Sequence, residues 1–185
     1  MRDLSLHLLD LAQNSITAGA SLVTVRVSLD SAGMLTLELT DDGRGMSPEL
    51  LERVTSPFAT TRTTRKVGLG IPLMKENAEK AGGTFRLESE LGKGTRLTAT
   101  MDTKNIDCLP LGDLSGTLLS LMLTNPLHPD FLFEGKTPKE ECSFDTRAVR
   151  EALGSDIPFN EPSVAEWLKE ALEEEMNPIF GGVML

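Results

Sequence analysis

Two pairs of alternating apolar and polar runs constrain the fold of this chain most strongly. The first pair covers residues 23–29 and 35–40, the second covers 85–89 and 97–101, and a short turn containing glycine joins the members of each pair. A period of two places every second side chain on one face of a strand, and a short turn between two such runs favours a hairpin. The sequence therefore predicts an antiparallel sheet with one buried face.

Helical spacing of apolar residues surrounds these runs. It predicts a helix over roughly 3–17, a short helix from Pro48 to about Val54, and another that opens at Gly68–Gly70 and ends at Ala81–Gly83. Residues 55–67 show no periodicity, so we expect a mobile loop there. Helices that cover one face of an antiparallel sheet make an α+β fold.

Charge divides the chain into two parts. The net charge of the whole chain is -10, of which residues 1–103 contribute -1 and residues 104–185 contribute -9. We therefore predict one domain at 1–103 and a small acidic α+β appendage at 104–185. A surface that binds nucleic acid needs a cluster of basic residues, so the net negative charge argues against nucleic-acid binding. No apolar stretch is long enough to span a membrane.

The start of the chain lacks the basic and apolar segments of a secretory signal, and the chain has two cysteines, Cys108 and Cys142. Two cysteines are too few for a disulfide framework, so we expect free, buried thiols and a cytoplasmic location.

The acidic part has the composition of a folded segment, with five Phe and the only Trp of the chain. Its helices could pack either on the first part of the chain or on a partner protein. Its acidic face, Glu170–Glu175, could be either a solvated surface or a docking site for a partner. The predicted elements are a helix stopped at Asn125-Pro126, a hairpin over 131–144, a helix from Asp145 to about Leu153, and an amphipathic helix after Pro162 that buries Val164, Trp167, Leu168, Ala171 and Leu172.

Three groups of polar residues and glycines occur in a fixed order. Asp10 and Asn14 are four residues apart and share one helix face, with His7 one turn earlier. The run Asp41–Gly45 directly follows a strand, and Gly68–Gly70 directly precedes a helix. Each group alone has an ordinary structural explanation, and His7 alone indicates a surface or capping histidine. Together, in this order, they indicate a ligand site.

These groups, with Ser56-Pro57-Phe58 and Gly92–Thr95, resemble the ordered sequence boxes of the Bergerat-fold ATP-binding family, also called GHKL. The resemblance covers residues 1–102. The stretch 57–101 is most similar to sensor histidine kinases, whereas Asn14–Ser21 is closer to MutL-like ATPases. The family resemblance implies an α/β sandwich in which helices cover one face of a mixed, mainly antiparallel sheet.

The resemblance also implies the ligands ATP and Mg²⁺. It implies that Asn14 binds the metal, that Asp41 accepts a hydrogen bond from the adenine amino group, and that Thr95 lies near the adenine. Glycines 43 and 45 would let the backbone approach the ring, and the amides at Gly68–Gly70 would bind phosphates at a helix N-terminus. The full set of implied nucleotide-binding residues is Asn14, Asp41, Gly43, Gly45, Met46, Phe58, Arg65, Lys66, Gly68, Leu69, Gly70 and Thr95.

Asp10 matches an acid that activates water in the ATPases of this family, and a carboxylate there can act as general base. Three functions stay open: phosphorylation of a partner protein in trans, an ATP-hydrolysing or ATP-sensing switch that acts through the C-terminal part, and ATP binding without turnover. His7 and His128 lack the family's phosphoacceptor surroundings, so the acceptor is expected on another protein. Thr17 stands where many kinases carry a basic residue, which leaves more phosphate neutralisation to Arg62, Arg65 and Lys66 in the lid.

Overall fold

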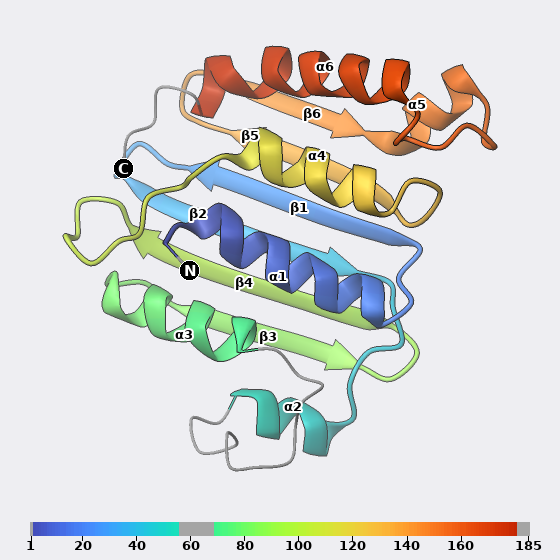
Figure 1. Ribbon diagram of the computed structural model, residues 1–185. Coiled ribbons are helices and arrows are strands. Elements are labelled where there is room, and N and C mark those ends of the chain that lie inside the picture. Colours follow the sequence, from blue (N-terminus) through green and yellow to red (C-terminus); the bar gives the residue numbers. More distant parts are fainter. Residues whose placement is uncertain (1, 56–68, 181–185) are drawn as a thin grey trace.

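A single mixed sheet of six strands carries a layer of helices over one face (Figure 1). The computed structural model describes residues 2–55 and 69–180. The elements in chain order are α1 (Leu4–Thr17), β1 (Leu22–Leu29), β2 (Met34–Asp41), α2 (Pro48–Thr55), α3 (Gly70–Lys80), β3 (Phe85–Glu90), β4 (Gly94–Asp102), α4 (Leu114–Thr124), β5 (Asp130–Lys136), β6 (Glu141–Asp145), α5 (Thr146–Leu153) and α6 (Pro162–Phe180).

The strand order is β3-β4-β2-β1-β5-β6, and every neighbouring pair is antiparallel except β1 and β5. Both hairpins expected in residues 1–103 are confirmed, and so is the hairpin expected over 131–144. The chain passes from β4 through α4 to β5, and such a crossover connection places the next strand parallel to the one before it. Strand β5 therefore has the direction of β4, which is also the direction of its neighbour β1.

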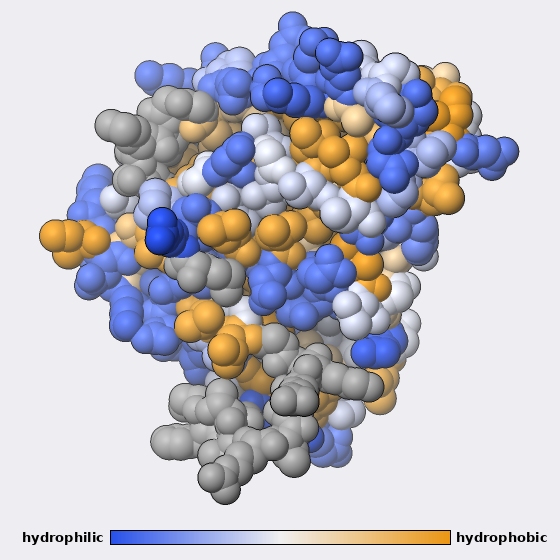
Figure 2. All heavy atoms as spheres, in the orientation of Figure 1, coloured by the Kyte–Doolittle hydropathy of each residue, from blue (hydrophilic) through white to orange (hydrophobic). Residues whose placement is uncertain are grey.

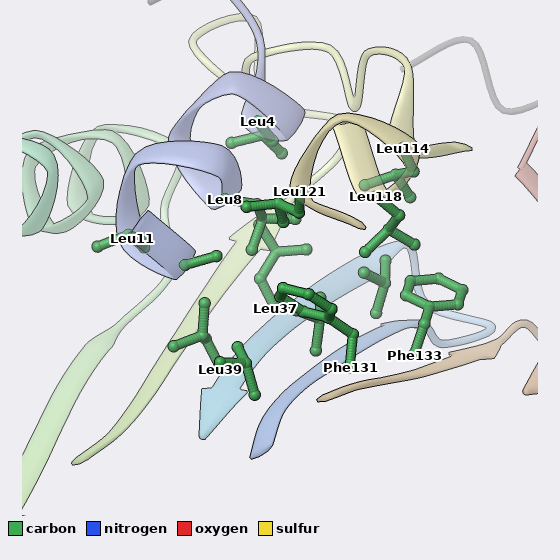
Figure 3. Close-up of a cluster of buried hydrophobic side chains, with 14 of the residues drawn as sticks. Leu4, Leu8, Leu11, Leu37, Leu39, Leu114, Leu118, Leu121, Phe131 and Phe133 are labelled. Carbon is green, nitrogen blue, oxygen red and sulfur yellow. The ribbon is translucent and has the colours of Figure 1, made fainter. Parts of the chain in front are cut away.

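One core lies between the sheet and the helices. In Figure 3, leucines of α1 point toward the sheet and meet side chains of β2, β5 and α4. Phe131 and Phe133 of β5 and Leu118 and Leu121 of α4 belong to the same buried cluster as Leu8 of α1. Helix α4 contacts α1, and α6 contacts α4. The acidic C-terminal part therefore extends the same sheet and core. Its helix α4 packs on α1 of the first part, whereas α5 and α6 contact β5, β6 and α4 of the acidic part.

The first turn of α1 is held by the segment that follows β4. The amides of Leu4 and Ser5 donate to the carbonyls of Pro110 and Leu111, each at 2.9 Å. Asp3 caps the helix by accepting from the amide of Leu6 at 3.0 Å. Because the first amides of a helix have no partner within it, these bonds satisfy groups that would otherwise be unpaired.

Helix α6 has the amphipathic pattern expected after Pro162. Leu168, Leu172 and Met176 are buried, whereas the acidic residues on its outer face, such as Glu170 and Glu174, are exposed. Figure 2 shows this surface as mainly hydrophilic along the top of the helix layer. Trp167, expected on the buried stripe, is 50% exposed. A side chain with that much exposed surface contributes little to the core.

The sheet face opposite the helices carries charges on neighbouring strands. Glu38 of β2 accepts from Arg26 of β1 at 2.8 Å and from Arg96 of β4 at 2.6 Å, and Arg26 also pairs with Glu134 of β5. Opposite charges on adjacent strands stabilise a sheet modestly, and they make this face polar where it contacts solvent. In residues 2–55 and 69–180, no helix combines the length and the apolar character that crossing a membrane requires.

Both cysteines are free, as expected, but they are half-buried rather than fully buried. Burial raises the pKa of the Cys108 thiol and of the Cys142 thiol. Both side chains therefore stay protonated near neutral pH and behave as small apolar groups.

Candidate functional site

Helix α1 presents His7, Asp10 and Asn14 along one flank, toward α3. Spacings of three and four residues place them in one row, because an α-helix has 3.6 residues per turn. The expectation of a surface or capping histidine is wrong: His7 is 2% exposed. Its Nε2 atom lies 2.9 Å from Nδ2 of Asn77 on α3, and the amide donates. Tertiary packing of α3 against α1 covers this flank, which helical spacing alone assigns to solvent.

Asp41 lies at the end of β2 and is 6% exposed. Its Oδ2 atom accepts from Ser15 Oγ at 2.6 Å and its Oδ1 atom accepts from the amide of Gly43 at 2.9 Å. Ser15, which sequence reasoning did not include in the site, therefore fixes the carboxylate in place. The signal was available, because Ser15 continues the buried stripe of Leu4, Leu8 and Leu11 and a polar residue there needs a partner.

The turn after β2 needs glycine for close packing, in addition to the expected approach to a ring, which stays a prediction. Gly45 has φ +67°, and a Cβ on it would lie 2.0 Å from the carbonyl oxygen of Glu90. A Cβ on Gly43 would lie 3.0 Å from Ala18 and from Oδ1 of Asp41. The turn packs closely against the end of β3 and against Ala18 after α1, so any larger residue would push the turn away from them.

A cavity of about 120 Å³ lies beside Asp41, between α1, α2 and the sheet. Apolar side chains of Leu11, Leu39, Leu87, Leu97 and Ile71 form most of its lining. Asn14, Asp41, Gly45, Met46 and Thr95 of the sequence-derived set all line it, together with Ser15, Thr17, Arg44, Leu50 and Ala18. A flat apolar ring with one edge that donates a hydrogen bond fits an apolar cavity with one buried carboxylate.

Thr95 faces Asp41 across the β2–β4 ladder. Its hydroxyl lies 2.9 Å from the hydroxyl of Ser89, which donates to the carbonyl of Gly94 at 2.9 Å and accepts from the amide of Met46 at 2.8 Å. Ser89 is a second residue that sequence reasoning missed. It connects the lining residues Met46 and Thr95 and so holds this wall of the cavity.

Asp10 does not line this cavity and lies against the start of α3. A Cβ on Gly70 would be 2.0 Å from Asp10 Oδ2, so the carboxylate occupies the space that only glycine leaves free. Asp10 Oδ2 and Asn14 Nδ2 are both buried, and neither has a hydrogen-bond partner within residues 2–55 and 69–180. Buried polar atoms are nearly always paired in folded proteins, so these two atoms indicate room for a polar ligand at this point.

The chemistry of this flank fits Mg²⁺ bridging phosphates. Mg²⁺ takes oxygen ligands and uses few protein groups when it also binds phosphate. Asn14 supplies an amide oxygen, Asp10 supplies a carboxylate, and the N-terminus of α3 attracts anions. In the described residues no cluster of three or more His, Cys, Asp or Glu side chains forms a complete metal cage. A cation here would therefore depend on the phosphates of the nucleotide.

Four residues of the sequence-derived set fall outside the described part of the chain: Phe58, Arg65, Lys66 and Gly68. Arg62 and the loop expected over 55–67 lie there too, apart from residue 55, which ends α2. Leu69, at the N-cap of α3, is 61% exposed.

Two curated relatives each match about half of this chain. Sporulation kinase D of Bacillus subtilis (strain 168) is 31% identical over 97 residues, which are 51% of this chain and 19% of that protein. Sensor histidine kinase ZraS of Escherichia coli O157:H7 is 34% identical over 93 residues, which are 49% of this chain and 20% of that protein. This chain thus corresponds to about a fifth of the length of these relatives.

A solved structure extends the likeness in fold. The N-terminal domain of a DNA repair protein superposes with a TM-score of 0.51 at 16% identity, over 77% of this chain and 52% of that chain. The superposed 77% of this chain is more than residues 2–105 alone could supply, so the shared fold includes residues of the acidic part. The sequence model of the histidine kinase-, DNA gyrase B-, and HSP90-like ATPases matches residues 2–105. The chain belongs to this ATPase family, which includes the ATP-binding domains of histidine kinases.

Proposed function

We propose that this protein binds Mg·ATP and transfers the γ-phosphoryl group to a partner protein. The observation that carries the nucleotide site is the buried Asp41 carboxylate, fixed by Ser15 and Gly43 at the edge of an apolar cavity. Carboxylate oxygens accept hydrogen bonds only, so this edge favours adenine, which presents an amino group, over guanine, which presents a carbonyl at the same position. The bound adenine would lie against Leu39, Leu87 and Leu97.

The phosphates would extend toward the N-terminus of α3. Asn14 would hold Mg²⁺ through its side-chain oxygen, and the metal would neutralise charge on the phosphates. Asp10 lies at the same place, where a carboxylate can orient an attacking hydroxyl and accept its proton. Arg65 and Lys66 would neutralise the γ-phosphate.

Transfer to another protein is supported by the relatives and by His7. The named relatives are kinases, and His7 is too buried to accept a phosphoryl group in the folded chain. Three conservative variants test the nucleotide site: Asp41→Asn, Asn14→Asp and the neighbouring Asp42→Asn. Asp42 accepts from the amides of Ser21 and Leu22 and points away from the cavity, so it is a matched control.

Calorimetry with Mg·ATP should show a loss of at least about tenfold in affinity for Asp41→Asn. The amide replaces one of the two acceptor oxygens by an NH₂ donor, which would then face either the amide of Gly43 or the donors on the Ser15 side. The Asp42→Asn variant should bind like the wild type. Equal affinities of the Asp41 and Asp42 variants would exclude this site. For phosphoryl transfer, incubation with γ-labelled ATP should place the label on a second protein, and the Asn14→Asp variant should fail to do so. The stability of the labelled bond to acid or alkali identifies which type of side chain is phosphorylated.

An ATP-driven switch is the second candidate, and the bonds between α1 and residues 110–111 favour it. Helix α1 holds Asp10 and Asn14 and is bonded to the segment that leads into α4, so a shift of α1 would reach the acidic part. Phosphate release without any partner should then occur and should fall at least about tenfold in Asp10→Asn, with Mg·ATP affinity kept. Unchanged release in Asp10→Asn would exclude Asp10 as the general base.

A further inference from the structure

One partly buried polar contact joins α1 to α3. Nδ2 of Asn77 donates to Nε2 of His7 at 2.9 Å, and it is the one side-chain hydrogen bond between these two helices in residues 2–55 and 69–180. His7 is 2% exposed, and its buried Nδ1 atom has no hydrogen-bond partner among the described residues. Two apolar residues would fill this space without leaving an unpaired nitrogen, so maximal stability does not account for the pair.

The contact forms part of a larger arrangement. His7 and Asp10 lie three residues apart on one flank of α1, and Asn77 and Gly70 lie seven residues, or two turns, apart on one face of α3. The second contact is between Asp10 Oδ2 and Gly70, the first residue of α3. Helix α3 is thus held against α1 at two points, one at its N-terminus and one two turns later.

The other contacts of α3 with the core are apolar. Ile71, Met74 and Ala78 are its buried apolar side chains. Apolar packing is not directional, so it tolerates a small slide of a helix along its axis better than a hydrogen bond does. Each residue of such a slide moves the helix N-terminus by about 1.5 Å. Between α3 and α1, the His7–Asn77 hydrogen bond is the contact that resists this motion. At the C-terminal end of α3, the carbonyl of Lys80 also accepts from Nδ2 of Asn105 at 3.2 Å.

We propose that His7 and Asn77 are positioning residues that fix α3 along the axis of α1 and so set the distance from the N-terminus of α3 to Asp10 and Asn14. This inference rests on the proposed function, which places the phosphates of ATP at that point. The pair acts mainly on the phosphate end, because Asp41, Ser15 and Thr95 build the adenine end on other contacts and α3 contributes only Ile71 to the described lining of that cavity. Its loss weakens binding of the triphosphate and leaves binding of adenosine unchanged.

A double-mutant cycle separates positioning from stability. The variants are His7→Leu, Asn77→Leu and His7→Leu/Asn77→Leu, with His7→Gln as the conservative variant. Asn77→Leu leaves the buried imidazole of His7 unpaired, and His7→Leu leaves the half-buried amide of Asn77 unpaired. Each should lower the unfolding midpoint, Asn77→Leu more strongly, whereas the double variant restores apolar packing and should regain most of the loss. Calorimetry with Mg·ATP and with adenosine gives, for each variant, the ratio of the affinity for Mg·ATP to the affinity for adenosine.

The double variant should bind adenosine within about twofold of the wild type and Mg·ATP at least about tenfold more weakly. His7→Gln should keep the wild-type ratio, because its amide also reaches Asn77. Thr146→Val is the matched control: Thr146 is buried and bonded to Asp130 and Phe131, away from the site, so this variant should lose stability and keep the ratio.

A wild-type ratio in the double variant would overturn the positioning role and leave the pair as a structural contact. A parallel loss of adenosine and Mg·ATP binding would overturn it as well, because the effect would then reach the whole cavity. A wild-type protein that binds adenosine but not Mg·ATP would instead refute the proposed function at the phosphate end, and binding of neither would refute the whole nucleotide site.

Discussion

Among single residues, His7 makes the stability of the protein depend on pH. Burial lowers the pKa of His7 from its ordinary value of 6.5, against the opposing charges of Asp10 and Asp3. The unfolded chain takes up a proton as the pH falls through 6.5, while the folded chain resists it until the lowered pKa is reached. Stability from this group is therefore complete above 6.5 and is lost as the pH falls below it.

We expect the denaturation midpoint of the wild type to fall between about pH 7.5 and pH 5.5, and His7→Gln to remove most of that fall. His128 is exposed and is the only other histidine, so His128→Gln is the control and should keep the wild-type profile. Urea denaturation followed at several pH values measures both. A His7→Gln variant with the full wild-type fall would contradict the assignment.

Among the elements, β1, β2 and β4 are connected on the exposed face of the sheet by Glu38. Its side chain is 12% exposed and pairs with Arg26 and Arg96. Burial alone would raise the pKa of Glu38, but the hydrogen bonds from Arg96 and Arg26 outweigh it and lower this pKa below 4.5. A lowered carboxylate pKa contributes stability above the unfolded value, and that contribution is lost as the pH falls through the folded value.

Glu38→Gln should therefore cost about 1 kcal/mol of the free energy of unfolding at pH 7, a figure kept small because both arginines are largely exposed. The difference from the wild type should shrink as the pH falls below about 4.5. The exposed Glu88, paired with exposed Arg86 on the outer strand β3, is the matched position, and Glu88→Gln should be close to neutral. A constant difference at every pH would indicate lost packing instead of lost charge.

For the whole molecule, the question is whether residues 1–103 fold alone, as the charge boundary predicts. Phe131, Phe133, Leu118 and Leu121 from the acidic part cover Leu8 and the inner face of β1. Removing residues 104–185 exposes that apolar surface and leaves β1 as an open sheet edge. We expect the shortened chain to aggregate or to lose most amide-exchange protection in β1 and α1.

Amide hydrogen exchange and sedimentation of the shortened chain measure this outcome. A folded, monomeric shortened chain that binds Mg·ATP like the whole protein would establish the boundary near residue 103 and make the acidic part a separable unit. If the shortened chain does not fold, as we expect, its failure to bind a partner would not show where the partner docks. Point substitutions on the exposed face of α6 are then the informative variants.

Much of this architecture could be predicted from the sequence because it depends on local periodicity. The period-two runs determined the hairpins, Asp145 marked the start of α5, and the apolar spacing after Pro162 marked α6. The order of Asn14, Asp41, Gly45 and Thr95 predicted a shared site, and the fold brings them to one cavity. The nucleotide-binding roles of these residues stay predictions, as do those of Phe58, Arg65, Lys66 and Gly68, which lie outside the described residues.

The sequence by itself determined which segments become helices and strands and which polar residues have chemistry to offer, because both depend on near neighbours along the chain. Only the tertiary structure decided that β5 lies parallel to β1, that His7 is buried against Asn77, and that Ser15 and Ser89 hold the cavity walls. Each of these depends on which helix or strand from a distant part of the chain covers a given face, and no local pattern encodes that choice.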